Sequence, residues 1–189
     1  MSDVWSTPTS ETKRGRARWP FVLVALGLAG ALFAGWWASQ NLFCGFTFTR
    51  GYTVPSPSME PTIRAGDRIR VIETQSIDRG DVIVFESPPG VDSGPARNFI
   101  RRIVAVGGDS IESVGGRLKV NGAILDERYV DTRCGGPLSG PALQPQTIPD
   151  GHVFVLGDNR CASRDSRVYG PIPLSSIVGR VCDADLHSP

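Results

Sequence analysis

The chain has 189 residues, enough for one ordinary domain with an appendage. Its 20 basic and 19 acidic residues nearly balance, and it lacks the clustered basic face that nucleic-acid binding requires, so we expect no nucleic-acid partner. It has only two histidines, and its four cysteines do not have metal-ligand spacing. We therefore expect no metal site and no other cofactor.

A basic tail precedes an apolar segment at the N-terminus. Residues 1–19 are polar and without periodicity, which is typical of a disordered tail. The basic residues that cluster in it are Lys13, Arg14, Arg16 and Arg18. Residues 20–38 are uncharged and long enough to cross a bilayer as a helix, which takes about 18 residues or more. Basic residues before this segment and none soon after it place the N-terminus in the cytoplasm and residues 39–189 outside.

A cleaved signal peptide is the alternative interpretation of the apolar segment. Ala29-Gly30-Ala31 resembles a small-residue cleavage site. The segment continues past that site and exceeds the about 7–15 residues of an ordinary apolar signal region, which favours a membrane anchor. Either interpretation exports the C-terminal domain.

All four cysteines follow the apolar segment, at Cys44, Cys134, Cys161 and Cys182. In an oxidising compartment they are expected to form one or two disulfides. The sequence does not determine the pairing, and Cys134 with Cys161 is our first hypothesis.

After a connector at 39–52, the patterns are those of short strands separated by Gly, Pro and Asp. The expected strands are Arg68–Val71, Asp81–Phe85, Phe99–Val106, Leu118–Val120, Ala123–Leu125, His152–Leu156 and Ile177–Val181. Asn121-Gly122 predicts a hairpin turn, and the segment Gly135–Pro149 predicts an exposed loop. The extracytoplasmic domain is therefore predicted to be mostly β, a barrel or a sandwich.

Two serines stand among three prolines in the segment Val54–Thr62, which predicts a stiff, extended backbone. By composition alone this is a linker. Three further segments suggest more: 80–85 (GDVIVF), 101–109 (RRIVAVGGD) and 157–167 (GDNRCASRDSR). With the anchor and in this order, they resemble a type I signal peptidase from Phe21 to Val181.

The resemblance implies a β-rich unit with a hydrophobic surface that sits on the membrane. It implies a membrane-bound serine endopeptidase that removes signal peptides from exported preproteins at small-residue sites. The implied partners are these preproteins, membrane lipid and the secretion translocase. By position, Ser58 matches the nucleophile, whose N–H forms the oxyanion hole with the Ser56 hydroxyl. Met59 would line the cleft and Ser163 would orient the general base, while the supporting polar network would be Asp158, Asp165 and Arg167.

One position departs from the family pattern. Where the family has a lysine as general base, this chain has Arg101, followed by Arg102. Arginine stays protonated and donates hydrogen bonds without accepting them. The loss of a general base typically lowers a rate by a factor of about 10²–10⁴. No other residue is an evident substitute, since Lys119 and His152 are expected on solvated strand positions.

Several functions therefore stay open at this point. The first is signal peptidase I with Arg101 in the base position, including a specialised form that processes a pilin or conjugation subunit. The second is a catalytically impaired homologue that binds signal peptides or assists an active paralogue. A third is a self-processing protein similar to the cleavage domains of SOS-type repressors, which also use a serine–lysine pair.

Overall fold

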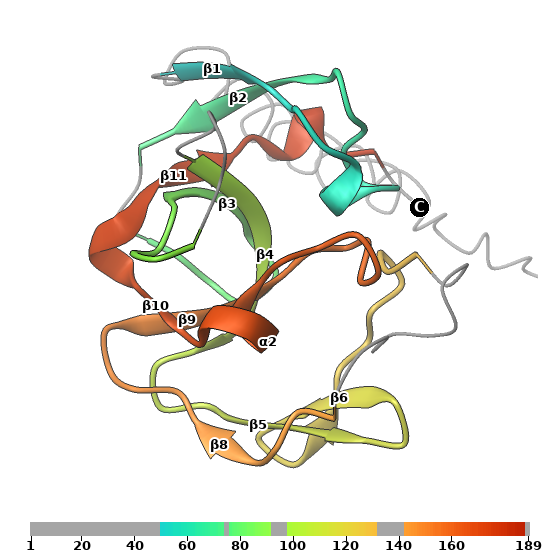
Figure 1. The fold of residues 1–189 in the computed structure, drawn as a ribbon, viewed down its shortest axis with the longest axis vertical. Helices are drawn as coiled ribbons and strands as arrows, with labels where there is room; N and C mark the ends of the chain where they lie inside the picture. The colour runs from blue at the N-terminus through green and yellow to red at the C-terminus, as the bar shows by residue number, and fades with distance from the viewer. Residues whose placement is uncertain (1–49, 74–75, 92–97, 132–141, 188–189) are drawn as a thin grey trace, which may run out of the picture. The chain divides into compact units, whose positions relative to one another are not determined.

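The computed structural model describes residues 50–73, 76–91, 98–131 and 142–187 (Figure 1). Within these ranges, no helix is long and apolar enough to cross a membrane. The predicted tail at 1–19 and anchor at 20–38 lie outside the described residues, so the membrane topology stays a prediction. Cys161 and Cys182 are both disulfide-bonded. Cys44 and Cys134 lie outside the described residues, and the proposed pairing of Cys134 with Cys161 is therefore untested.

The described residues form two antiparallel sheets, which confirms the mostly β prediction. The larger sheet has the strand order β1-β2-β11-β3-β4-β9-β10. Its strands are β1 (Arg50–Thr53), β2 (Arg68–Ile72), β3 (Val82–Glu86), β4 (Asn98–Val106), β9 (His152–Leu156), β10 (Ile172–Pro173) and β11 (Ile177–Val181). The smaller sheet, of order β7-β6-β5-β8, contains β5 (Ser110–Val114), β6 (Arg117–Val120), β7 (Ala123–Ile124) and β8 (Gln146–Thr147).

The described helices are all short: η1 (Pro57–Met59), α2 (Ser166–Tyr169), η3 (Leu174–Ser176) and η4 (Asp183–Asp185). The predicted hairpin turn is present between β6 and β7, where Asn121 and Gly122 take φ angles of 51° and 82°. Both values lie in the left-handed region that a two-residue hairpin turn requires. Strands β1, β5, β8 and β10 were not predicted. Strands β8 and β10 have two residues each, too few for an alternating pattern to show.

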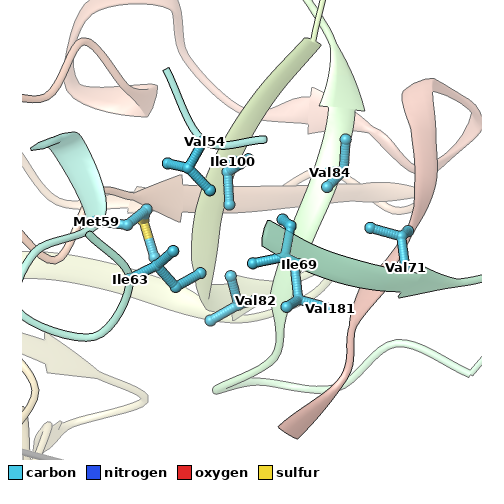
Figure 2. Packing of buried hydrophobic residues seen from close by; sticks show 9 residues of the cluster. All are labelled: Val54, Met59, Ile63, Ile69, Val71, Val82, Val84, Ile100 and Val181. Carbon is cyan, nitrogen blue, oxygen red and sulfur yellow. The ribbon is translucent and has the colours of Figure 1, made fainter. Parts of the chain in front are cut away.

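Strand β3 is buried on both faces and joins two parts of the core. Val82 and Val84 point into a cluster that Figure 2 shows, and Ile83 and Phe85 point into the cluster on the opposite face. This alternation follows from the two-residue period of a strand. The cluster in Figure 2 contains Val54, Met59, Ile63, Ile69, Val71, Val82, Val84, Ile100 and Val181. Val54, Met59 and Ile63 lie within five residues of Ser58, so this part of the chain is anchored in the core.

Candidate active site

Ser58 lies in η1, one turn of 3₁₀ helix that begins with Pro57. The fixed φ of proline suits the first position of such a turn. Ser58 is only 4% exposed, and the adjacent Met59 is fully buried in the core cluster. Its side chain packs in the core cluster and helps to fix the turn that carries Ser58, and its place in a substrate cleft stays a prediction.

The loop that follows β9 holds the backbone of this turn in place. The N–H of Asn159 donates to the carbonyl oxygen of Ser58 at 3.1 Å, and its side-chain Nδ2 donates to the carbonyl oxygen of Pro57 at 3.2 Å. Gly157 makes this close approach possible, because a Cβ atom there would lie 2.6 Å from the carbonyl oxygen of Ser58. The Gly-Asp-Asn segment at 157–159 thus positions the turn through backbone contacts.

The hydroxyl of Ser58 has two polar neighbours. Nη1 of Arg101 donates to Ser58 Oγ at 2.9 Å, and Oγ of Ser56 lies 3.2 Å from it. Strand β4, which pairs with β3, brings Arg101 to this position. Because the guanidinium only donates, Ser58 accepts that bond and can donate its own hydrogen to Ser56. The three residues that the motifs singled out therefore meet at one hydroxyl.

Arg101 is held by backbone carbonyls and by an aromatic ring. Its Nη1 also donates to the carbonyl oxygen of Ile100 at 2.5 Å, while Nε and Nη2 both donate to that of Arg164, at 3.2 and 2.8 Å. The guanidinium carbon lies 5.3 Å from the ring centroid of Phe99, within cation–π range. Burial lowers the pKa of Arg101, although an arginine starts from so high a value that it stays a cation near neutrality.

The Ser163 hydroxyl makes no hydrogen bond to Arg101 among the described residues, and its expected role in orienting the base stays a prediction. Its Oγ is buried and has no hydrogen-bond partner among the described residues. The side chain packs against Gly157, where an added Cβ would lie 2.2 Å from Oγ. Arg101 donates to the carbonyl of the next residue, Arg164, and leaves the Ser163 hydroxyl unused.

The two aspartates of the predicted network each pair with an arginine. Asp158, fully buried, accepts from Nε and Nη2 of Arg102 at 2.9 and 2.7 Å, and this pairing raises the pKa of Arg102 although burial opposes it. Asp165 accepts from Nε and Nη2 of Arg167, both at 2.8 Å, and from the N–H of Gly157 at 3.1 Å. Both carboxylates are engaged in holding the loop, which leaves neither in contact with Ser58 in the described structure.

Glu127 and Tyr129 also belong to this polar network, and neither was predicted from the sequence. Arg160 is buried and donates to Oε1 of Glu127 at 2.5 Å. Tyr129 lies under Arg102, whose guanidinium carbon is 4.1 Å from the ring centroid. Residues 126–131 follow the hairpin with no pattern of their own in the sequence, so nothing in it marked Glu127 as a partner of Arg160 or Tyr129 as a partner of Arg102.

The other candidate bases have partners elsewhere. Lys119 pairs with Glu112 at 2.8 Å within the smaller sheet. His152 Nδ1 lies 3.0 Å from the carbonyl oxygen of Asp150, and the second histidine of the chain, His187, lies with its Nε2 3.0 Å from Oδ2 of Asp67. Among the described residues, Ser56 and Arg101 are thus the side chains bonded to the Ser58 hydroxyl.

Comparisons with known proteins give the family. The profile described as "Signal peptidase, peptidase S26" matches residues 21–182. The chain is 33% identical to thylakoidal processing peptidase 1, chloroplastic, of Arabidopsis thaliana over 90% of its length and 52% of that protein. It is 36% identical to signal peptidase I of Leptolyngbya laminosa, over 67% of this chain and 64% of the relative. It therefore spans less than two thirds of either relative.

The match extends to bacterial enzymes and to a solved structure. The chain is 34% identical to signal peptidase IB of Staphylococcus aureus, over 69% of this chain and 74% of the relative. The crystal structure of a signal peptidase I from Enterococcus faecalis V583 superposes with a TM-score of 0.48 at 28% identity, over 57% of this chain and 98% of that one. With a family profile that covers most of its length, the chain belongs to the signal peptidase family, peptidase S26.

Proposed function

We propose that this chain is a membrane-bound serine endopeptidase of the signal peptidase I type, which removes signal peptides from exported preproteins at small-residue sites. The observation that carries this proposal is the buried Ser58 hydroxyl, bonded to Arg101 at 2.9 Å and to Ser56 at 3.2 Å in a turn fixed by core and loop contacts. The relatives named signal peptidase I support the same reaction.

In the proposed reaction, Ser58 Oγ attacks the carbonyl carbon of the scissile peptide bond. The C–N bond then breaks, the leaving amine takes up a proton, and water hydrolyses the acyl ester to release the signal peptide and regenerate Ser58. The N–H of Ser58 and the hydroxyl of Ser56 would stabilise the oxyanion of the tetrahedral intermediates.

Arg101 sets the rate of the first step in this proposal. A guanidinium 2.9 Å from Oγ stabilises a serine alkoxide electrostatically, but it has no lone pair with which to take the proton. The proton must therefore pass from Ser58 to solvent water or hydroxide, so that the half-buried Ser56 keeps its own hydrogen for the oxyanion. We expect turnover to be slower, by about 10²–10⁴, than a lysine base at the same position would give.

The proposal includes the membrane topology expected from residues 1–38. The apolar segment 20–38 would anchor the domain, with the N-terminus in the cytoplasm and the domain outside. Preproteins emerging from the secretion translocase would then meet Ser58 on the extracytoplasmic side of the membrane.

A second candidate function is a homologue that binds signal peptides without cleaving them. Arg101 favours it, because every hydrogen bond that its guanidinium makes among the described residues is a donated one. In that case the Ser58 hydroxyl would serve as a binding group.

In the deciding experiment, the full chain is solubilised in detergent and mixed with a preprotein that contains an Ala-x-Ala site. The cleaved fraction is followed by gel and the cut position by mass spectrometry. Cleavage by wild type that disappears in Ser58→Ala supports the peptidase. A silent wild type with an active Arg101→Lys variant supports the binding homologue. Cleavage retained in Ser58→Ala would rule out the proposed nucleophile.

A further inference from the structure

Arg101 differs from the other arginines around the site in its partners. Arg102 pairs with Asp158 at 2.7 Å, and Arg167 pairs with Asp165 at 2.8 Å. Arg160 pairs with Glu127. Arg101 is 4% exposed and, among the described residues, has no carboxylate within ion-pair distance. It is therefore a buried cation without a directly paired counter-charge, since the charges of Asp165 and Asp158 act on it only from beyond ion-pair distance.

The acceptors that do surround Arg101 are all neutral. They are the carbonyl oxygens of Ile100 and Arg164 and the hydroxyl oxygen of Ser58. Neutral dipoles satisfy hydrogen bonds, but they return only part of the hydration energy that a buried charge loses. An anion that arrived beside Ser58 would supply the missing counter-charge in a region of low dielectric, where such pairs are strong.

We propose that the Ser58–Arg101 site binds peptides through a free C-terminal carboxylate, the group that cleavage at Ser58 would leave on a released signal peptide. This inference rests on the proposed function, because it takes the site to be one that receives a peptide carbonyl. The carboxylate carbon of the product is the former scissile carbonyl carbon. Its two oxygens would therefore lie next to Ser58 Oγ and to the groups that stabilise the oxyanion, the N–H of Ser58 and the hydroxyl of Ser56. Ser56, whose Oγ lies 3.2 Å from that of Ser58, is only half-buried.

The chemistry distinguishes this site from one with a neutral base. A deprotonated lysine amine is uncharged and offers a carboxylate no counter-charge. Arginine remains charged, and its Nη1 faces Ser58 at 2.9 Å, where a charge-assisted hydrogen bond to a carboxylate can form. The chain should therefore retain a peptide acid more tightly than the matching peptide amide, and the acid should inhibit any turnover by occupying the site.

The test measures binding of three fluorescently labelled peptides of one sequence ending in Ala-x-Ala. The first has a free C-terminal acid and the second a C-terminal amide. The third has the amide together with an added aspartate at the N-terminal end, so its net charge equals that of the acid. Fluorescence anisotropy with the full chain in detergent gives each affinity. We expect the acid to bind about tenfold or more tightly than either amide, as charge-assisted hydrogen bonds imply.

Variants assign the preference to Arg101. Arg101→Gln keeps hydrogen-bond donors at the site without the charge, and it should bring the acid and amide affinities together. Arg128→Gln is the matched control, because Arg128 is an exposed arginine paired with Asp126, and it should keep the wild-type ratio. The wild-type comparison of the three peptides decides the question even if Arg101→Gln fails to fold.

Equal binding of acid and amide by wild type would overturn the proposal, as would no measurable binding of either. A preference that survives in a folded Arg101→Gln variant, or that the third peptide shares, would also overturn it. The outcome is separable from the proposed peptidase activity. Acid preference without preprotein cleavage keeps this inference and rejects the peptidase, whereas cleavage without acid preference does the reverse.

Discussion

The carbonyl oxygen of Arg164 accepts two hydrogen bonds from Arg101, from Nε at 3.2 Å and from Nη2 at 2.8 Å. The preceding residue, Ser163, keeps a buried hydroxyl with no partner among the described residues. The guanidinium fork thus contacts the backbone of the 157–167 loop, whereas an ammonium group has no second nitrogen with which to do so. This difference between the two cations leads to the first two predictions.

Replacing Arg101 by lysine should raise preprotein cleavage by about 10²-fold or more, because a buried amine can lose its proton and act as the general base for Ser58. Initial rates on an Ala-x-Ala preprotein measure the effect. Arg101→Gln is the control, since it removes the charge without adding a base and should not gain activity. A lysine variant that is folded and no faster than wild type would show that Arg101 is not what limits turnover.

Ser163→Ala should leave cleavage by wild type nearly unchanged but should lower cleavage by the Arg101→Lys variant. In wild type the Oγ of Ser163 has no partner among the described residues, so its loss should leave cleavage within about twofold. In Arg101→Lys the hydroxyl is free to bond the amine, and its removal should cost about tenfold or more. A double-mutant cycle on initial rates gives this coupling directly. Additive effects of the two substitutions would show that Ser163 does not orient residue 101.

The dependence of the cleavage rate on pH should differ between wild type, with arginine at position 101, and the Arg101→Lys variant. Burial lowers the pKa of Arg101, but arginine begins above about 12, so it stays charged over the working range. Wild-type cleavage should therefore rise with pH without a plateau up to about pH 10, since no group that accepts the proton from Ser58 becomes saturated. Arg101→Lys should rise and then level off once the amine is deprotonated. A plateau in wild type would reveal a titrating base that contacts Ser58.

The sequence predicted the fold better than it predicted the contacts at the site. Alternation and β-branched runs predicted β2, β4, β9 and β11 because each strand carries a repeating side-chain pattern. Ser58 and Arg101 were brought together only by the family resemblance, since 43 positions separate them and no periodicity encodes their pairing. The hydrogen bonds from Arg101 to the Arg164 carbonyl and the burial of Met59 depend on where the folded backbone places these residues. No pattern in the neighbouring sequence predicts that placement.

The buried pair of Arg102 and Asp158 should be a major contributor to stability. Arg102→Met leaves the fully buried carboxylate of Asp158 without its bidentate partner, which typically costs about 3–5 kcal/mol of unfolding free energy. Arg128→Met is the matched control, because its pair with Asp126 is exposed and should be worth about 1 kcal/mol or less. Denaturant titrations in detergent, followed by far-UV circular dichroism, give both values, because all four tryptophans precede residue 38 and do not report on the β domain. Similar losses in the two variants would mean that Arg102 acts as an ordinary surface charge.

Gly157→Ala should displace the turn that carries Ser58. An added Cβ would lie 2.6 Å from the carbonyl oxygen of Ser58, and 2.2 and 2.4 Å from Oγ and Cβ of Ser163. The Ser163 side chain can move, but the Ser58 carbonyl belongs to the backbone. The oxygen is also held by the N–H of Asn159 at 3.1 Å. We expect overpacking to cost about 1–3 kcal/mol of stability and to lower cleavage or peptide binding by at least tenfold.

Gly51→Ala provides the control for this substitution, because an added Cβ there meets no atom within 4 Å and should change neither stability nor binding. The double variant Gly157→Ala/Ser163→Gly removes the clash with the serine side chain and keeps the one with the Ser58 carbonyl. It should therefore recover stability only in part and recover little of the peptide binding. Full recovery of binding would show that Gly157 acts through Ser163, and that the backbone of Ser58 is not positioned by this close approach.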